Sequence, residues 1–531
     1  MKVTHIPFQK TGFFSKMMID YLEQSPSINN FYNNFPDITG FKNQLEEKQK
    51  IFKSSHRKTL NSALQEQYKN VNTTKYTKKN IDLLLKENTF TITTGHQLNL
   101  FTGPLYFVYK ILCAINLCED LKKNFPNNNF VPVYWMATED HDFDEIKYFN
   151  YKGEKVIWNR EDGGAVGRFS TNGLDEVFKV FENKIGNSNN AKALKNLFSK
   201  AYLEHNTLSD ATRFLANELF GKFGLVIIDG DDKQLKQLFT PYAKDELLNE
   251  SSHLSLAKTI TKLEENYGIQ VNPREINLFY LGENFRERII KRDEVYFVNN
   301  TKLQFTKEGI LKELEDNPTS FSPNVIMRPL YQEVILPNLC YIGGGGEQAY
   351  WLQLKEYFNK VAVPFPILLL RNSVQVITKK QADKLSRLNI SFDELFLNQH
   401  ELLSKKVVEN SDIKTSFEDK KNFLRNQFKE LKEVAKQTDV TFLNAVNAQE
   451  KKQLNGLDKL EKRLLKAEKH RQKDLVDRIT KLQNDILPNG GLEERQRNFS
   501  EYYLQYGAEF IELIKKSLQP LKLEFTIVEL D

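Results

Sequence analysis

Short apolar runs that are followed by polar or charged residues constrain the fold of this chain more than any other feature of its sequence. Three such runs are Phe130–Met136, Leu225–Ile228 and Ile367–Leu370. Strands that are apolar throughout are typical of parallel sheets, in which helices cover both faces. The β-branched stretch Phe90–Thr94 is followed by helical periodicity over Leu105–Leu121, and then by the first of these runs. This strand–helix–strand order predicts an α/β fold with a parallel sheet.

The regions around this core differ from it in their residue patterns. Residues 1–89 have helical spacing, residues 147–172 indicate a β insertion, and residues 253–320 are mixed and give no assignment. We place the core at residues 1–379, interrupted by insertions near 147–205 and 253–320. Polar residues cluster where the predicted strands end, and ligands bind at that edge of an open α/β sheet.

Residues 380–487 are rich in Lys, Glu, Leu and Gln and contain almost no Gly or Pro, which predicts a long α-helical coiled-coil domain. Leu457 and Leu464 keep a seven-residue spacing, but charged residues such as Glu461 fall on the same seam. An antiparallel helical hairpin or a short coiled coil fits this imperfect heptad better than a long dimeric rod. Residues 488–531 predict a helix and a final strand that return to the core.

The charge balance and the cysteine count exclude several classes of protein. The 531 residues include 75 basic and 70 acidic side chains, for a net charge of +5, whereas nucleic-acid binders usually show a clustered basic excess. Three cysteines, Cys113, Cys118 and Cys340, suggest reduced thiols. No window approaches the ~20 apolar residues of a membrane span. We expect a cytoplasmic protein that binds neither nucleic acid nor membrane.

The first candidate motif is Thr94-Gly95-His96-Gln97, with Gly103 shortly after it. Gly95 is expected to let the backbone turn sharply at the end of the strand. His96 and Gln97 would then lie on a loop that leads to a helix, where backbone amides and the helix N-terminus suit phosphate. The alternative is an ordinary structural histidine beside the residues of a helix start.

The second motif, Thr138–Glu145, places five carboxylates and a histidine within eight residues at a strand end. So dense a cluster is costly unless it binds a cation, an amine or a metal. The ammonium group of an amino acid or amino sugar would fit, and so would Mg²⁺ accompanying a nucleotide. We select Glu139, Asp140, His141 and Asp142 as candidates, with a solvated acidic turn as the alternative.

A third motif is the glycine run before a predicted helix, whose free amides could contact an anion. Its members are Gly343, Gly344, Gly345, Gly346 and the following Glu347. Arg328 and Arg371 could supply positive charge for a carboxylate or phosphate, although each could equally form a structural ion pair. No Cys-x-x-Cys and no His-Glu-x-x-His sequence occurs, so a metal site is not indicated.

In combination and in this order, the motifs are specific enough to identify a family. The residues concerned are Thr94–Gln97, Thr102–Tyr106, Lys110, Pro132–Asp142, Glu145, Arg328–Leu330, Gln332, Gly343–Glu347, Tyr350–Lys355, Pro488–Gly490, Glu494 and Arg495. Over essentially the whole chain, this pattern resembles the BshC family, the cysteine ligases of bacillithiol biosynthesis.

The resemblance implies a Rossmann-like core similar to that of class I aminoacyl-tRNA synthetases, with connective insertions and a coiled-coil domain that forms a homodimer. Thr94–Gln97 would stand where those synthetases carry their HIGH-type signature, and no lysine-rich KMSKS-type loop is found in the expected place. It also implies that cysteine is added to the amine of glucosaminyl malate in an amide-forming reaction, which we expect ATP to drive by phosphorylation or adenylation.

We expect different parts of the site to serve different steps of such a reaction. His96 and the amides of Gly343–Gly346 would stabilise phosphate charge. Glu139, Asp140 or Asp142 would hold the substrate ammonium, and His141 would assist proton transfer. Two rival functions are a nucleotidyl-transfer enzyme with another substrate and a non-catalytic, dimeric coiled-coil interaction protein.

Overall fold

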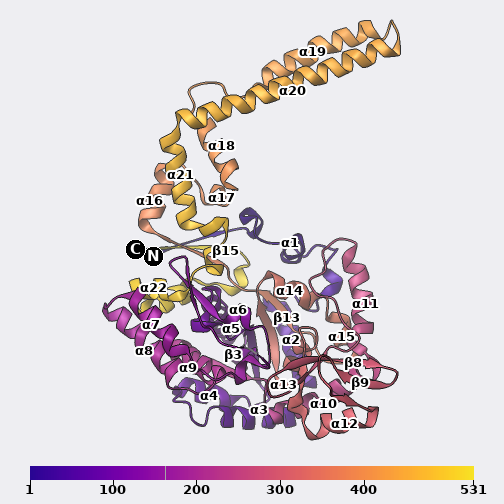
Figure 1. Ribbon diagram of the computed structural model, residues 1–531, viewed down its shortest axis with the longest axis vertical. Helices are drawn as coiled ribbons and strands as arrows, with labels where there is room; N and C mark the ends of the chain where they lie inside the picture. The colour runs from indigo at the N-terminus through magenta and orange to yellow at the C-terminus, as the bar shows by residue number, and fades with distance from the viewer. Residues whose placement is uncertain (162) are drawn as a thin grey trace. The chain divides into compact units, whose positions relative to one another are not determined.

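The computed structural model describes residues 1–161 and 163–531, which form two compact units (Figure 1). The first unit comprises Met1–Gln9, Phe13–Gln375 and Glu493–Val528. The second comprises Lys10–Gly12, Val376–Leu492 and Glu529–Asp531. In the described residues, no helix is both long enough and apolar enough to cross a membrane.

A five-stranded parallel sheet lies at the centre of the first unit, with the strand order β13-β12-β2-β3-β6. Its strands are β2 (Thr89–His96), β3 (Asn129–Met136), β6 (Val226–Asp229), β12 (Asn338–Gly343) and β13 (Ile367–Leu370). Every residue of β2, β12 and β13 is buried, as strands covered on both faces require. The predicted α/β fold with a Rossmann-like parallel sheet is confirmed.

The order of the strands reverses between β2 and β12. From β2 the chain adds β3 and then β6 on one side, and it later returns to place β12 and β13 on the other side. Ligands of open α/β sheets bind outside the carboxyl ends of the strands at such a reversal. The first and third sequence motifs, at the ends of β2 and β12, therefore meet at the expected position for a site.

Helix α5 (Tyr106–Asn124) connects β2 to β3 and is buried over most of its length. Its inner side chains join those of helix α2 (Ile38–Ile51) and of the sheet in one apolar cluster. Cys113, Cys118 and Cys340 are free thiols inside this cluster, so they serve as small apolar core residues. The other N-terminal helices are α1 (Lys16–Leu22), α3 (Ser54–Gln67) and α4 (Lys75–Leu83), in agreement with the predicted helical character of this region. The prediction is wrong at the start of the chain, where Lys2–Ile6 form strand β1.

The predicted sharp turn at Gly95 is wrong, because β2 continues through Gly95 and His96. A Cβ atom on Gly95 would lie 3.0 Å from the hydroxyl oxygen of Tyr341, so glycine here permits a close approach by the neighbouring strand. The turn comes later, at Phe101–Gly103, where three consecutive residues have φ values of 47°, 69° and 60°. The Asn498 side chain stabilises it by donating to the carbonyl oxygens of Phe101 (2.8 Å) and Gly103 (2.6 Å).

Two insertions interrupt the core. The first begins with the hairpin β4 (Tyr148–Tyr151) and β5 (Glu154–Ile157), as predicted, and continues as helices α7 (Leu174–Ile185), α8 (Asn189–Leu203) and α9 (Leu208–Phe220). The second, which the sequence patterns left without an assignment, contains an antiparallel sheet of order β10-β9-β8-β7-β11. Its strands are β7 (Leu278–Leu281), β8 (Arg286–Arg292), β9 (Val295–Val298), β10 (Gln304–Phe305) and β11 (Phe321–Pro323).

The second unit contains the predicted antiparallel helical hairpin, formed by α19 (Glu418–Ala435) and α20 (Val440–Arg471) (Figure 1). Apolar side chains pack between the two helices, among them Phe428 and Val446. Further along the seam the charged residues pair with each other, since Lys421 lies 2.5 Å from Glu461. These pairs explain why the heptad is imperfect.

We predict that Gly167→Ala destabilises the first unit. The Gly167 amide donates to the Thr138 carbonyl oxygen (2.8 Å), and a Cβ atom on Gly167 would lie 2.5 Å from the Thr138 Cβ. The loop after β3 would have to move, at a cost of about 1–3 kcal/mol of unfolding free energy. Gly268→Ala, which adds a Cβ in open space, is the matched control and should cost nothing. Calorimetric unfolding of both variants tests this, and equal stabilities would contradict the prediction.

Candidate active site

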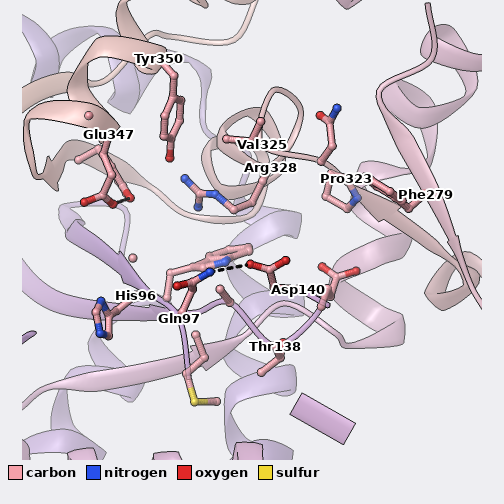
Figure 2. Close-up of a pocket in the computed structure, with 18 of the residues that line it drawn as sticks. His96, Gln97, Thr138, Asp140, Phe279, Pro323, Val325, Arg328, Glu347 and Tyr350 are labelled. Carbon is pink, nitrogen blue, oxygen red and sulfur yellow. Dashed lines mark hydrogen bonds between the residues drawn. The ribbon is translucent and has the colours of Figure 1, made fainter. Parts of the chain in front are cut away.

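A cavity of about 720 Å³ opens at the carboxyl ends of β2, β3 and β12, and residues of the second insertion complete its lining (Figure 2). Basic side chains outnumber acidic ones in this lining. The basic residues are Lys110, Arg274, Arg286, Arg288, Arg328, Arg371 and Arg495, and the acidic residues are Glu139, Asp140 and Glu347. A cavity with this excess favours ligands that carry several negative charges.

The cavity brings together most of the residues selected from the sequence. Those that line it are Gly95, His96, Gln97, Glu139, Asp140, Arg328, Gly344, Gly346, Glu347 and Arg371. Those outside its lining are Thr94, Gly103, His141, Asp142, Gly343 and Gly345. All three sequence motifs thus contribute to one cavity, although not every member of each motif reaches it.

Most selected residues outside the lining have local structural contacts. The Thr94 hydroxyl donates to the Ile342 carbonyl oxygen (2.8 Å), which links β2 to β12. Asp142 accepts a hydrogen bond from the Glu145 amide (3.3 Å) and caps the short helix α6 (Phe143–Ile146). The carbonyl oxygen of Gly343 accepts from the Arg371 amide (2.9 Å). Gly345 is the first residue of helix α14 (Gly345–Leu352).

His96 is buried at the end of β2, with its ring against Phe107 (4.9 Å between ring centroids). Burial, assisted by the nearby charge of Lys110, lowers the pKa of His96 from 6.5 to about 3. The imidazole is therefore neutral at physiological pH. Its Nε2 atom is buried and has no hydrogen-bond partner among the described residues. A buried polar atom without a partner suits a ligand that would complete its hydrogen bonding.

Lys110 and Glu347 connect the ends of β2 and β12. Lys110 is buried in α5, donates to the Gly95 carbonyl oxygen and lies 2.6 Å from Glu347. Glu347 also accepts from the Gly344 amide (2.9 Å) and from the Tyr341 hydroxyl (2.7 Å). Burial opposes the ionisation of Glu347, but the Lys110 charge and these hydrogen bonds outweigh it and lower its pKa. The Gly344 amide is thus already occupied, and the first amides of α14 remain for an anion.

The structural ion pair that we left open for Arg371 is present. Its guanidinium donates to both carboxylate oxygens of Glu494, at 2.9 and 2.7 Å, and both side chains are buried. The guanidinium also lies over the Tyr106 ring, 4.9 Å from its centroid. This bidentate pair fixes Arg371 at the wall of the cavity.

The acidic motif finds its cations within the chain itself. Glu139 pairs with Lys236 of helix α10 (Lys233–Asn249). Asp140 accepts from Gln97 (3.1 Å, dashed in Figure 2) and lies 3.8 Å from Arg286 of β8. Burial would raise the pKa of Asp140, but its hydrogen bonds with His141 and Gln97 and the Arg286 charge hold it well below the usual range. Asp140 is therefore ionised at physiological pH.

His141 is exposed, and its Nδ1 atom lies 3.0 Å from Nη1 of Arg286. Within the described ranges, no group of three or more His, Cys, Asp or Glu side chains is arranged to hold a metal ion.

Several residues of the cavity were not selected from the sequence. The sequence contained a signal for Lys110, because a charged residue in an otherwise apolar stretch of helix indicates a buried, paired or functional side chain. The sequence contained no such signal for three arginines of the second insertion, because that segment had no assignment; these are Arg274, Arg286 and Arg288. Tyr350 lies in a quoted motif and Tyr341 lies two residues before the glycine run, but the roles of both depend on which side chains face them in the fold.

We predict that His96 makes stability depend on pH. Below pH 6.5 the unfolded chain binds a proton at this histidine that the folded protein excludes. The free energy of unfolding is therefore unaffected by His96 above pH 6.5, and it decreases as the pH falls from 6.5 toward 3. Between pH 7 and pH 5 the loss should be about 2 kcal/mol.

Urea denaturation at both pH values tests this, and His96→Asn should remove that part of the pH dependence. His400→Asn, at an exposed position, is the control. An identical pH dependence in wild type and His96→Asn would contradict the prediction.

Comparison with known proteins places this geometry in a family. Residues 1–372 match the model described as "Bacillithiol biosynthesis BshC, N-terminal Rossmann-like domain". Residues 374–530 match "Bacillithiol biosynthesis BshC, C-terminal coiled-coil domain".

Proteins described as "Putative cysteine ligase BshC" are similar over nearly their full lengths. The one from Christiangramia forsetii is 54% identical, with 99% of each chain covered. The one from Flavobacterium psychrophilum is 55% identical, also with 99% of each chain covered. Among solved structures, an arginyl-tRNA synthetase described as putative, from Campylobacter jejuni, aligns over 83% of this chain and 97% of its own, with 9% identity and a TM-score of 0.23. That likeness is too distant to carry an argument, but the family models and relatives show that this chain belongs to the BshC family of bacillithiol biosynthesis.

Proposed function

We propose that this chain is a cysteine ligase that joins the carboxyl group of cysteine to the amine of glucosaminyl malate, with ATP as the driving nucleotide. The observation that carries the proposal is the excess of basic side chains in the cavity. Malate contributes two carboxylates and ATP contributes a triphosphate, so both suit a cavity of this charge. The family's described role in bacillithiol biosynthesis supports the same choice of substrates.

The reaction needs an activated acid and a neutral amine. A free carboxylate is a poor acyl donor because its leaving group would be oxide. Transfer of a phosphoryl or adenylyl group from ATP to the cysteine carboxylate gives a mixed anhydride and releases ADP or pyrophosphate. The sugar amine then attacks the acyl carbon, phosphate or AMP leaves, and the amine loses a proton.

The end of the cavity near β2 and β12 suits the activating step. The neutral His96 ring offers a buried Nε2 atom without a partner, and the first turn of α14 presents backbone amides. Lys110 and Arg371 add positive charge nearby, although each is already paired with a carboxylate. Donors fixed in a buried site stabilise charge that develops on a phosphate without first having to reorganise.

The opposite end suits the amine. Asp140 is ionised and can hold an ammonium group, but its low pKa makes it a weak base. His141 lies outside the lining of the cavity but contacts Arg286 within it, and it is the group that we assign to proton transfer. Because the described residues offer no metal-ligand cluster, a Mg²⁺ ion accompanying ATP would be held mainly by the phosphates.

We predict that the purified protein converts cysteine, ATP and glucosaminyl malate to bacillithiol, detected by mass spectrometry. Accumulation of AMP would show adenylation, and accumulation of ADP would show phosphorylation. His96→Asn should lower kcat by about 10²–10³, because the shorter side chain cannot place a hydrogen-bonding nitrogen at the position of Nε2. His400→Asn is the matched control. ATP consumption without this product would favour another nucleotidyl-transfer reaction, and no turnover by folded protein would favour a non-catalytic interaction protein.

We propose in addition that the hairpin of α19 and α20 joins two copies of the chain. Large apolar side chains remain exposed on it, including Phe423 (64%), Val434 (57%) and Val440 (73%). Phe423 and Val434 fall on one face of α19, because eleven residues make three turns. Large apolar side chains exposed on an otherwise polar hairpin are typical of an interaction surface, and a second copy of the same hairpin would cover them.

We predict that the double variant Phe423→Glu, Val434→Glu is monomeric, because two buried carboxylates would oppose association. Sedimentation velocity should show a dimer for the wild type and a monomer for this variant. Lys429→Glu, at an exposed position on another face of α19, should leave the dimer intact. A monomeric wild type, or a dimeric double variant, would contradict the proposal.

A further inference from the structure

Arg328 begins helix α13 (Arg328–Ile335) and projects into the cavity between Tyr350 and Gln97 (Figure 2). Aromatic rings surround its guanidinium carbon, with centroids at 5.4 Å for Tyr341, 5.7 Å for Trp135 and 5.9 Å for Trp351. Rings at these distances stabilise the charge of the guanidinium without using its hydrogen-bond donors.

The donors of Arg328 are only partly used. Nη1 donates to Oε1 of Gln332 (3.0 Å). Nη2 is buried and has no hydrogen-bond partner within the described residues. Leaving a charged donor unsatisfied costs more than leaving a neutral one, so this atom marks a place that a ligand is expected to fill.

A buried chain of contacts holds Arg328 in this orientation. The Gln332 amide nitrogen donates to Oε1 of Glu333 (3.0 Å), so its oxygen must face Arg328. The other carboxylate oxygen of Glu333 pairs with Lys48 of α2 (3.0 Å), and Asn338 of β12 donates to Oε1 (2.6 Å). Glu333 and Lys48 neutralise each other, so the charge of Arg328 is left for the cavity. All four supporting side chains are buried.

We infer that Arg328 is the receptor for a malate carboxylate of the amine substrate, and that Gln332, Glu333 and Lys48 are positioning residues that aim it. The inference rests on the proposed function for the identity of the substrate. A planar carboxylate matches the planar fork of donors of a guanidinium, of which Nη2 has no partner among the described residues. On the proposed function, the phosphates of the nucleotide would bind at the first turn of α14, whose backbone amides suit an anion.

The test is a titration of the full-length protein with malate alone, followed by tryptophan fluorescence. Trp135 and Trp351 flank Arg328, so an anion bound there should change their emission. Arg328→Lys keeps the charge but loses the planar pair of donors, and its Kd for malate should rise at least about ten-fold. Gln332→Met should raise the Kd in the same direction, by about three- to ten-fold, because the guanidinium loses its orienting acceptor.

Arg292→Lys, an exposed exchange of the same type at the end of β8, is the control and should bind malate as the wild type does. In the ligase reaction, Gln332→Met should raise KM for glucosaminyl malate and leave kcat largely unchanged, which a general loss of structure would not do. If Gln332→Met fails to fold, Gln332→Asn, which shortens the same amide, replaces it.

Two results would overturn the inference. One is Arg328→Lys binding malate as tightly as the wild type does. The other is inorganic phosphate competing for the same fluorescence change with equal affinity, since the receptor would then belong to phosphate. The titration contains neither ATP nor cysteine, so its result can be interpreted even if the ligase assay fails.

Discussion

The parallel pairing of β2 with β12 is the interaction on which the rest of the site depends. It sets Thr94 beside Ile342 and so brings His96 next to a glycine run that lies far away in the sequence. Lys110 secures the junction from beneath, because one ammonium group contacts both the Gly95 carbonyl oxygen and the Glu347 carboxylate. Loss of this pairing would separate the two motifs and leave a buried lysine without its acceptors, at a cost of several kcal/mol.

Around this junction each carboxylate is compensated by a cation of the chain itself. Glu347 has Lys110, Glu139 has Lys236, and Asp140 has Arg286. A buried charge without a partner is strongly destabilising, so this pairing explains how the acidic motif can exist at a strand end. It also means that the remaining basic side chains determine which sign of charge the ligand carries. Arg328 is the clearest of these, since the buried network behind it neutralises its own charges and not that of the guanidinium.

What the sequence could predict was local. The apolar runs indicated the buried strands, and the polar residues after them indicated the edge at which the cavity lies, because both signals arise within a few consecutive residues. Gly95 shows the limit. A glycine at a strand end has several uses, and only the position of Tyr341 on the neighbouring strand shows that close approach, and not a turn, requires it. Arg286 escaped detection for a related reason, since the short strands of the second insertion have no distinctive period and the residue matters only through Asp140 and His141.

The charge of the cavity also bears on how an amine could react there. A primary amine is protonated in water at neutral pH, and an ammonium group cannot attack an acyl carbon. Neighbouring positive charges disfavour that protonated form, so the excess of basic over acidic side chains in the cavity would lower the pKa of a bound amine. Asp140 opposes this effect, but its own pairing with Arg286 weakens it. On the proposed function, one electrostatic arrangement therefore serves two purposes: it attracts the polyanionic substrates, and it shifts the attacking amine toward its neutral, nucleophilic form.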